Sequence, residues 1–120
     1  MPQQNYSIFI PLKVDSEQNK KEHWAVSNKR HQLQKLVVKQ YLSTQSKITL
    51  PCTIILTRIA PRKMDTDNMI FGFKFIKDAV AEWIHPGLAT GRADDDPNIT
   101  WLYDQEKGKP KQYAIRIEIF

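Results

Sequence analysis

Residues 48–59, with the sequence ITLPCTIILTRI, are the most strand-like part of the chain. Most of these positions are β-branched, and β-branched side chains are favoured in strands because they pack well on a pleated surface. We therefore predict a central strand here, which is interrupted near Pro51 and ends at Ala60 and Pro61. A sheet built on this strand is the centre of the predicted fold.

Three further strands are expected around it. Residues 6–14 form the first, with Pro11 marking a bulge or a sheet edge. Residues 99–105 form another, followed by a turn over residues 106–110. The last covers residues 113–120, where alternation places one set of side chains on the same face, namely Tyr113, Ile115, Ile117 and Ile119.

Helical spacing of apolar residues predicts a first helix over residues 23–44. Its apolar positions are Leu33, Leu36, Val37 and Tyr41, with Trp24 as an uncertain member. The opposite face carries Asn28, Gln32, Lys35 and Lys39. We expect that face to be solvated, and phosphate contacts are the alternative.

A second helix is expected over residues 68–84, with Asp67 as its N-cap and an end at His85, Pro86 and Gly87. Gly72 lies inside it and disfavours an unbroken helix by about 1 kcal/mol relative to Ala. The predicted order is β-α-β-α-β-β. This order indicates an α+β domain in which two helices pack on one face of a small mixed sheet.

Length and composition set limits on the kind of protein. A chain of 120 residues is typical of a single domain, which we expect to cover residues 1–120. The chain has one cysteine, Cys52, and we expect it in the core rather than in a disulfide or a nucleophilic site. No apolar run approaches the roughly 18 residues of a membrane span, and we expect a cytoplasmic protein that is not exported. The net charge of +5 favours a polyanionic partner such as nucleic acid.

Five aspartates fall in two tight groups, each next to a predicted element: Asp65 and Asp67, and then Asp94, Asp95 and Asp96. Clustered carboxylates repel one another, and a divalent cation with a preference for oxygen ligands would offset that repulsion. The alternatives are a helix cap at Asp67 and a solvated acidic loop within residues 87–97. If the two groups share one ion, residues about thirty positions apart must converge.

Lys74 follows Asp67 by seven residues and precedes Asp78 by four. On one helix these residues share a face. Lys74 is therefore expected either to pair with Asp78 or to contact a phosphate and stabilise the charge that develops on it. Zinc is disfavoured because the three histidines are scattered without a partner at metal-ligand spacing.

The run RKMDTDNM at residues 62–69, followed by Lys74, Asp78 and the acids before Ile99, resembles the RusA family of Holliday junction resolvases. The resemblance covers residues 48–120 and is sharpest over residues 61–99. It implies a homodimeric, Mg²⁺-dependent endodeoxyribonuclease, with Mn²⁺ as a substitute, that binds four-way DNA junctions and nicks two strands symmetrically in recombination and repair. It also implies a phage or prophage protein acting in a bacterial cytoplasm.

The resemblance assigns roles to particular residues. Asp65 and Asp67 match the family's paired metal ligands, and Asp95 and Asp96 match its later pair, of which Asp96 is catalytic. Lys74 matches the catalytic lysine when three residues are inserted after Asp67, since the usual position falls on Phe71.

Basic residues outside the acidic groups are expected to bind flanking DNA backbone: Arg62, Lys63, Lys107, Lys109 and Lys111. One or two metal ions are both compatible with this assignment. The alternative function is a non-catalytic phage DNA-binding protein with the same fold.

Overall fold

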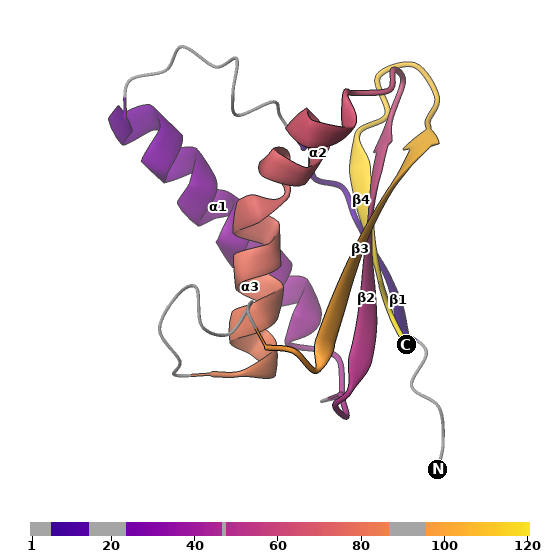
Figure 1. Cartoon of the computed structure of the whole chain (residues 1–120). Helices are drawn as coiled ribbons and strands as arrows, with labels where there is room; N and C mark the ends of the chain where they lie inside the picture. The colour runs from indigo at the N-terminus through magenta and orange to yellow at the C-terminus, as the bar shows by residue number, and fades with distance from the viewer. Residues whose placement is uncertain (1–5, 15–23, 47, 87–95) are drawn as a thin grey trace.

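The computed structural model describes residues 6–14, 24–46, 48–86 and 96–120 of the chain. In chain order its elements are β1 (Tyr6–Ile10), α1 (Trp24–Leu42), β2 (Cys52–Ala60), α2 (Thr66–Gly72), α3 (Lys74–Ile84), β3 (Ile99–Lys107) and β4 (Ala114–Ile119). The strands form one sheet in the order β1-β4-β2-β3, with the helices on one side of it (Figure 1). The predicted α+β class with a mixed sheet is confirmed.

The direction of the strands determines which loops meet. β4 is antiparallel to both β1 and β2, whereas β2 and β3 are parallel. Two neighbouring parallel strands need a crossover that carries the chain back along the sheet, and α2 and α3 provide it here (Figure 1). The segment after β2 and the segment before β3 therefore lie at opposite ends of the sheet.

Alternation along the strands separates a helix-covered face from a bare face. On the covered face, Ile54 of β2 is in register with Ile119 of β4 and Trp101 of β3. Cys52 also points to this face and is buried, as expected. The fully buried large side chains of the core come from all layers and include Ile10, Val38, Leu42, Ile54, Leu56, Phe73, Ile76, Val80, Ile115, Ile117 and Ile119.

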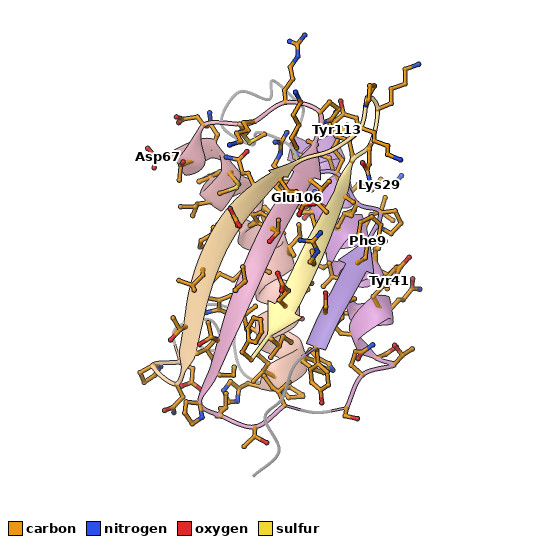
Figure 2. All side chains as sticks on the ribbon, turned by 90° about the vertical axis from the view of Figure 1, so that its right-hand side faces the viewer. Phe9, Lys29, Tyr41, Asp67, Glu106 and Tyr113 are labelled. Carbon is orange, nitrogen blue, oxygen red and sulfur yellow. The ribbon has the colours of Figure 1, made fainter. Side chains whose placement is uncertain are left out.

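The bare face carries an ion pair toward the end of the sheet at which β2 and β3 finish, where Figure 2 labels Glu106. Arg116 of β4 donates through its Nη1 to Glu106 Oε2 of β3 at 2.8 Å. In the register, Arg116 is level with Thr57 of β2 and Glu106 is level with Ile59, so the pair crosses over β2. Thr57 and Ile59 are only 2% and 4% exposed although no helix covers them.

The prediction for the buried face of α1 was correct for Val37, which is partly buried against the core, and wrong for the exposed Leu33, Leu36 and Tyr41. Leu33 and Leu36 are 58% and 52% exposed, whereas the core is met by a stripe of residues four positions apart, Gln34, Val38 and Leu42. Apolar side chains occur on both sides of this helix, so helical periodicity alone does not decide which side is buried.

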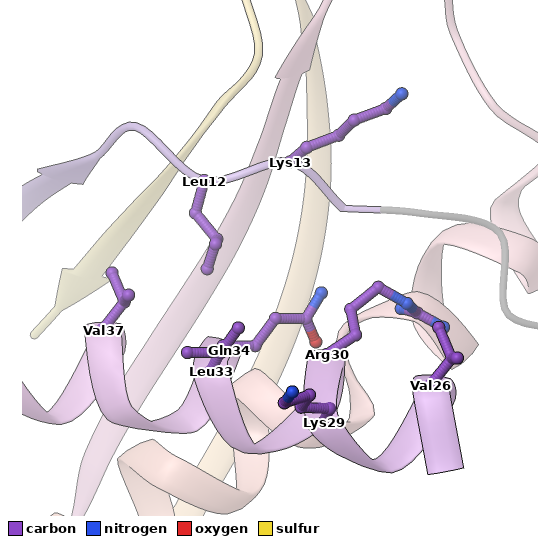
Figure 3. A pocket seen from close by; sticks show the side chains of 8 residues that line it. All are labelled: Leu12, Lys13, Val26, Lys29, Arg30, Leu33, Gln34 and Val37. Atoms are coloured by element: carbon purple, nitrogen blue, oxygen red, sulfur yellow. The ribbon is translucent and has the colours of Figure 1, made fainter. Parts of the chain in front are cut away.

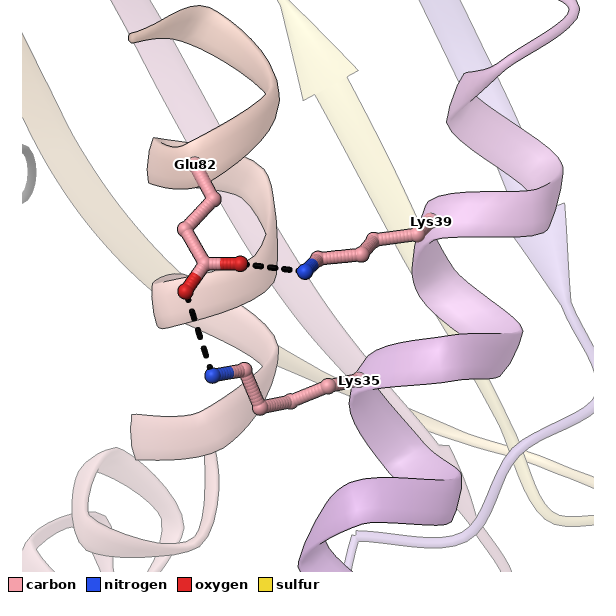
Figure 4. A network of polar contacts seen from close by, with 3 residues as sticks. All are labelled: Lys35, Lys39 and Glu82. Carbon is pink, nitrogen blue, oxygen red and sulfur yellow. Dashed lines mark hydrogen bonds and ion pairs between the residues drawn. The ribbon is translucent and has the colours of Figure 1, made fainter. Parts of the chain in front are cut away.

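Two lysines expected on the solvated face of α1 instead contact α3. Lys35 Nζ lies 3.2 Å from Glu82 Oε1, and Lys39 pairs with the other oxygen of the same carboxylate (Figure 4). The long alkyl stems of lysine allow its charge to reach a partner on the neighbouring helix. Asn28 and Gln32 are exposed, as predicted for that face.

The single helix expected over residues 68–84 is two helices separated by Phe73. The Phe73 N–H donates to the carbonyls of Met69 and Ile70, and its ring is fully buried, with a centroid 6.0 Å from that of Tyr103 on β3. Gly72 is buried beside it. Burial of the aromatic ring thus coincides with the glycine that disfavoured a continuous helix.

Prolines account for two differences in strand bounds, whereas β3 extends two residues beyond its expected end, to Lys107. β1 ends at Ile10, directly before Pro11, and β2 begins at Cys52, directly after Pro51, because proline cannot donate to a strand ladder. Tyr113 precedes β4 and is 40% exposed, while Ile115, Ile117 and Ile119 share the buried face.

In the part of the chain that the structure describes, no helix has the length and apolarity to span a membrane.

Candidate nucleic-acid and metal site

Asp65 and Asp67 lie just beyond the carboxyl end of β2. β2 ends at Ala60, and Asp65 occupies the N-cap position of α2, which places Asp67 in the first turn rather than at the expected cap. Asp65 does not cap the helix with its side chain. Both residues are exposed, and neither carboxylate has an ion-pair or side-chain hydrogen-bond partner among the described residues. Both are therefore available to a ligand.

The segment that leads into Asp65 is fixed by Gln105 of β3. The Gln105 side chain accepts a hydrogen bond from Met64 N–H at 2.8 Å and donates one to the Met64 carbonyl at 2.7 Å. A side-chain amide that satisfies both polar groups of one residue replaces a strand partner. We call this pair of contacts the Gln105 clamp, and it sets the position of the residue immediately before Asp65.

Arg58 supports the clamp from β2. Its side chain is 8% exposed, and Nη1 donates to the Arg62 carbonyl at 2.8 Å and to Gln105 Oε1 at 3.3 Å. Arg58 and Gln105 are in register on adjacent strands. Sequence analysis missed both residues; the available signal was a charged residue at an inward position of an otherwise apolar strand.

Five exposed cations lie at the same end of the sheet as Asp65. Lys107 is in register with Ala60, and Gly108 N–H donates to the Ala60 carbonyl at 2.8 Å, which joins the β3–β4 turn to the end of β2. Asp67 and Tyr113 both lie at this end in Figure 2. We call this region the basic end, formed by Arg62, Lys63, Lys107, Lys109 and Lys111.

The β3–β4 turn holds its lysines in a defined conformation. Lys109 N–H donates to Gln112 Oε1 at 2.8 Å, and Gln112 N–H donates to the Lys109 carbonyl at 3.0 Å. Lys111 has a φ of 63°, a left-handed conformation that costs a residue with a Cβ about 1 kcal/mol. The turn therefore presents its positive charges on an ordered backbone.

Lys74 is the first residue of α3 and is exposed. Its Nζ lies 5.5 Å from the centroid of the Phe75 ring, and among the described residues no ion pair joins it to Asp78. Asp78 is 7% exposed and faces the interior. The expected Lys74–Asp78 ion pair is therefore not formed, and the break at Phe73 separates Lys74 from the helix that carries Asp67.

Asp96 lies at the other end of the sheet. It precedes β3 by three residues, and its Oδ2 lies 2.5 Å from His85 Nε2 while its Oδ1 accepts from Asn98 N–H at 2.8 Å. These contacts hold the pKa of the Asp96 carboxyl below its ordinary value, the Asn98 hydrogen bond most strongly and the His85 hydrogen bond next. Asp96 thus has local partners of its own.

The structure does not bring Asp96 to Asp65 and Asp67. β2 and β3 are parallel over nine paired residues, which at about 3.3 Å per residue separates their two ends by roughly 26 Å. Asp65 follows one end and Asp96 precedes the other, so a single ion within one chain cannot contact both. The sequence did not indicate that β3 runs parallel to β2, and this parallel direction causes the separation.

The other acidic residues of the second group, Asp94 and Asp95, lie outside the described residues. Within the described ranges, no group of three or more His, Cys, Asp or Glu side chains is arranged to hold a metal ion.

The thiol of Cys52 has a raised pKa because it is buried and, to a smaller extent, because Asp96 is negatively charged nearby. A raised pKa disfavours the thiolate, so Cys52 is unsuited to act as a nucleophile.

Comparison with known proteins adds no assignment. No protein-family model matches the chain, and no curated protein matches it.

Proposed function

We propose that this chain is a metal-dependent endodeoxyribonuclease that acts on branched DNA, as the sequence resemblance implies. The observation that carries the proposal is the pair of carboxylates Asp65 and Asp67, which have no side-chain partner among the described residues and which follow the Gln105 clamp beside the basic end. Cations bind the DNA backbone without regard to sequence, and a metal ion held by the neighbouring acids would lie close to a backbone bound in this way.

The donor set fits Mg²⁺ better than a metal that needs a full set of protein ligands. Mg²⁺ is commonly held by one or two carboxylates, with water and substrate phosphate completing its shell. Asp65 and Asp67 would hold it, with Mn²⁺ as a substitute. When bound, such an ion polarises a phosphoryl oxygen and lowers the pKa of a bound water. The acids alone would repel DNA, and the five cations of the basic end offset that repulsion.

The roles of the other predicted residues follow from their positions. Lys74 stays a proposed phosphate contact because it is exposed and starts the helix after α2. Asp96 is not proposed as a ligand of the same ion in the same chain. A homodimer that nicks a four-way junction in two strands is proposed from the resemblance, and sedimentation at working concentration tests it: a monomer would contradict paired nicking.

The direct test is cleavage of a labelled four-way junction with Mg²⁺ by wild-type protein and by three variants. We expect Asp65→Asn and Asp67→Asn to lose cleavage while their junction affinity stays equal or rises, because each removes a negative charge near phosphate. Glu118→Gln, a carboxylate on β4 outside the site, is the matched control and should cleave like the wild type. Cleavage retained by both aspartate variants would exclude this site.

A fourth variant, Asp96→Asn, tests the separation of the two acidic groups. If the site is confined to the carboxyl end of β2 in one chain, this variant cleaves. Loss of cleavage with an intact fold would show that Asp96 is needed, and would contradict a site made by Asp65 and Asp67 alone.

A second function is favoured by one observation, the distance between Asp96 and the other acids. A non-catalytic DNA-binding protein with this fold needs the basic end but not a shared metal site. It predicts tight junction binding with no nicking of junction, flap or duplex in Mg²⁺ or Mn²⁺, and an affinity that Asp67→Asn does not reduce. Nicking of duplex as fast as of junction would indicate a less selective nuclease.

A further inference from the structure

The outer side of α2 carries two exposed apolar side chains next to Asp67. Ile70 and Phe71 are 40% and 45% exposed. They follow Asp67 by three and four residues, the spacing at which side chains are neighbours on one side of a helix. The proposed metal ligand and an exposed aromatic ring are therefore adjacent on one short helix.

The inner side of α2 fixes the direction in which this ring points. Met69 and Gly72 are buried, and so is Phe73 directly after the helix. The Gln105 clamp holds the segment that leads into the helix. A rotation of α2 that hid Phe71 would expose these core residues, so the ring is presented on a well-packed element.

Other exposed apolar side chains belong to elements that carry neither Asp65 nor Asp67. Val26 and Leu33 line a pocket of about 410 Å³ on α1 (Figure 3). Phe9 is 50% exposed, but it lies on β1, at the opposite edge of the sheet from β3 and on the other side of the view from Asp67 (Figure 2). Phe71, by contrast, shares its helix with a proposed metal ligand.

The exposed area of the ring suits one base better than a protein partner. A whole aromatic side chain buries about 150–250 Å², so an exposed fraction of 45% leaves roughly 70–110 Å² at Phe71. A stable protein interface buries about 800 Å² on each partner. Asp67 and Lys74 are exposed on either side of Phe71 along the chain, and a protein that covered them would have to compensate both charges. A stacked base covers the ring alone.

The charges around α2 suit nucleic acid. Arg62 and Lys63 of the basic end precede the helix, and Lys74 follows it. Cations bind phosphates without regard to sequence, and an aromatic ring beside them can stack on any base, because every base has a π-face. Within a continuous duplex each base face is covered by its neighbours, so a base must leave the stack before it meets the ring.

From these features we infer that Phe71, with Ile70 beside it, stacks on one unpaired base of the bound DNA, and that this contact selects branched DNA over continuous duplex. The inference rests on the proposed function, in which DNA binds at the basic end beside α2. An apolar side chain can instead wedge between paired bases and kink a duplex. The experiment below separates these two contacts.

Fluorescence anisotropy in metal-free buffer measures binding without cleavage. It compares three DNAs: a blunt duplex, the same duplex with one unpaired thymidine, and the same duplex with an abasic residue in place of that thymidine. We expect the wild type to bind the thymidine bulge about tenfold more tightly than the other two, the effect of one base–aromatic stacking contact. The abasic DNA keeps the additional phosphate of the bulge, so the difference between the two bulges measures the contribution of the base.

Two variants of Phe71 and one matched control assign the effect to its ring. Phe71→Leu should lose the tenfold preference and leave duplex affinity unchanged, whereas Phe71→Tyr keeps an aromatic ring and should retain the preference. Phe9→Leu makes the same change at the exposed phenylalanine of β1 and should bind like the wild type. Circular dichroism melts confirm that each variant is folded.

Three results would overturn the inference. The first is equal affinity of the wild type for the thymidine and abasic bulges. The second is a blunt duplex bound as tightly as the thymidine bulge, with Phe71→Leu weakening both, as expected for a wedge. The third is self-association in sedimentation that Phe71→Leu abolishes, because a second copy would then cover the ring.

Cleavage of the four-way junction in Mg²⁺ is a separate measurement. Cleavage by the wild type together with any of these three results contradicts the base contact and leaves the nuclease intact. A preference for the thymidine bulge that depends on Phe71, without cleavage in Mg²⁺ or Mn²⁺, supports the base contact and contradicts the nuclease alone.

Discussion

Replacement of Gln105 by Leu tests whether the clamp positions the acidic pair. The substitution keeps a side chain of similar volume but removes the hydrogen bonds to Met64 N–H at 2.8 Å and to the Met64 carbonyl at 2.7 Å, with the longer one from Arg58 at 3.3 Å. At about 1 kcal/mol net for each of the two short bonds, we expect the free energy of unfolding to fall by about 2 kcal/mol. In a domain of this size that corresponds to a melting temperature lower by roughly 6–12 °C.

Thermal unfolding followed by circular dichroism measures the stability effect, and junction cleavage at a temperature where both proteins are folded measures the effect on the site. Cleavage should fall more than junction affinity, because the substitution frees the segment before Asp65 and leaves the basic end intact. Gln32→Leu, at an exposed position of α1, is the matched control and should change neither quantity.

An intermediate variant separates the two short hydrogen bonds. Gln105→Glu keeps an acceptor for Met64 N–H but has no donor for the Met64 carbonyl, so its stability should lie between those of wild type and Gln105→Leu. If Gln105→Leu melts and cleaves like the wild type, the clamp does not position Asp65.

Three further predictions concern other parts of the fold. The pKa of Glu82 is lowered from its ordinary value of 4.5, first by its hydrogen bond with Lys39. The contribution of this screened pair, about 0.5 kcal/mol, is present above pH 4.5 and is lost as the pH falls through the lower folded pKa. Urea titrations of wild type and Glu82→Gln should therefore differ at pH 7, and the difference should shrink as the pH is lowered below 4.5. Gly108→Ala should lower the melting temperature, because a Cβ there would lie 3.0 Å from Gln112 Oε1 and 3.1 Å from Ile59 Cγ2; an unchanged melting temperature would show that the turn adjusts. Replacement of three lysines of the basic end by glutamine should reduce the slope of log affinity against log salt by about 2.7, or about 0.9 for each phosphate that is no longer neutralised; these are Lys107, Lys109 and Lys111. An unchanged slope would place the DNA elsewhere.

The sheet could be predicted because its strands carry strong local signals. The β-branched stretch of β2 and the alternation of Ile115, Ile117 and Ile119 in β4 each specify a strand without knowledge of its neighbours. Prolines 11 and 51 limit two of the strands for the same local reason. Local signals also identified Asp65 and Asp67 at the start of a helix, although the cap lies two residues earlier than expected, at Asp65.

The predictions that were wrong concern the arrangement of the helices and strands in space. The buried side of α1 is selected by its contact with α3 and the sheet, where Glu82 attracts Lys35 and Lys39. The distance from Asp65 to Asp96 is determined by the parallel pairing of β2 and β3. The Gln105 clamp joins residues forty-one positions apart, a relationship that a single sequence does not reveal.

The ion pair between Arg116 and Glu106 has a consequence for self-association. Edge and face contacts between sheets of different molecules are a general route to aggregation. A second sheet laid flat on the bare face would have to dehydrate both charges of this pair, and removing charged groups from water is costly unless each is fully compensated. The same two side chains that shield Thr57 would therefore keep the uncovered side of the sheet from stacking with its own copies at high concentration.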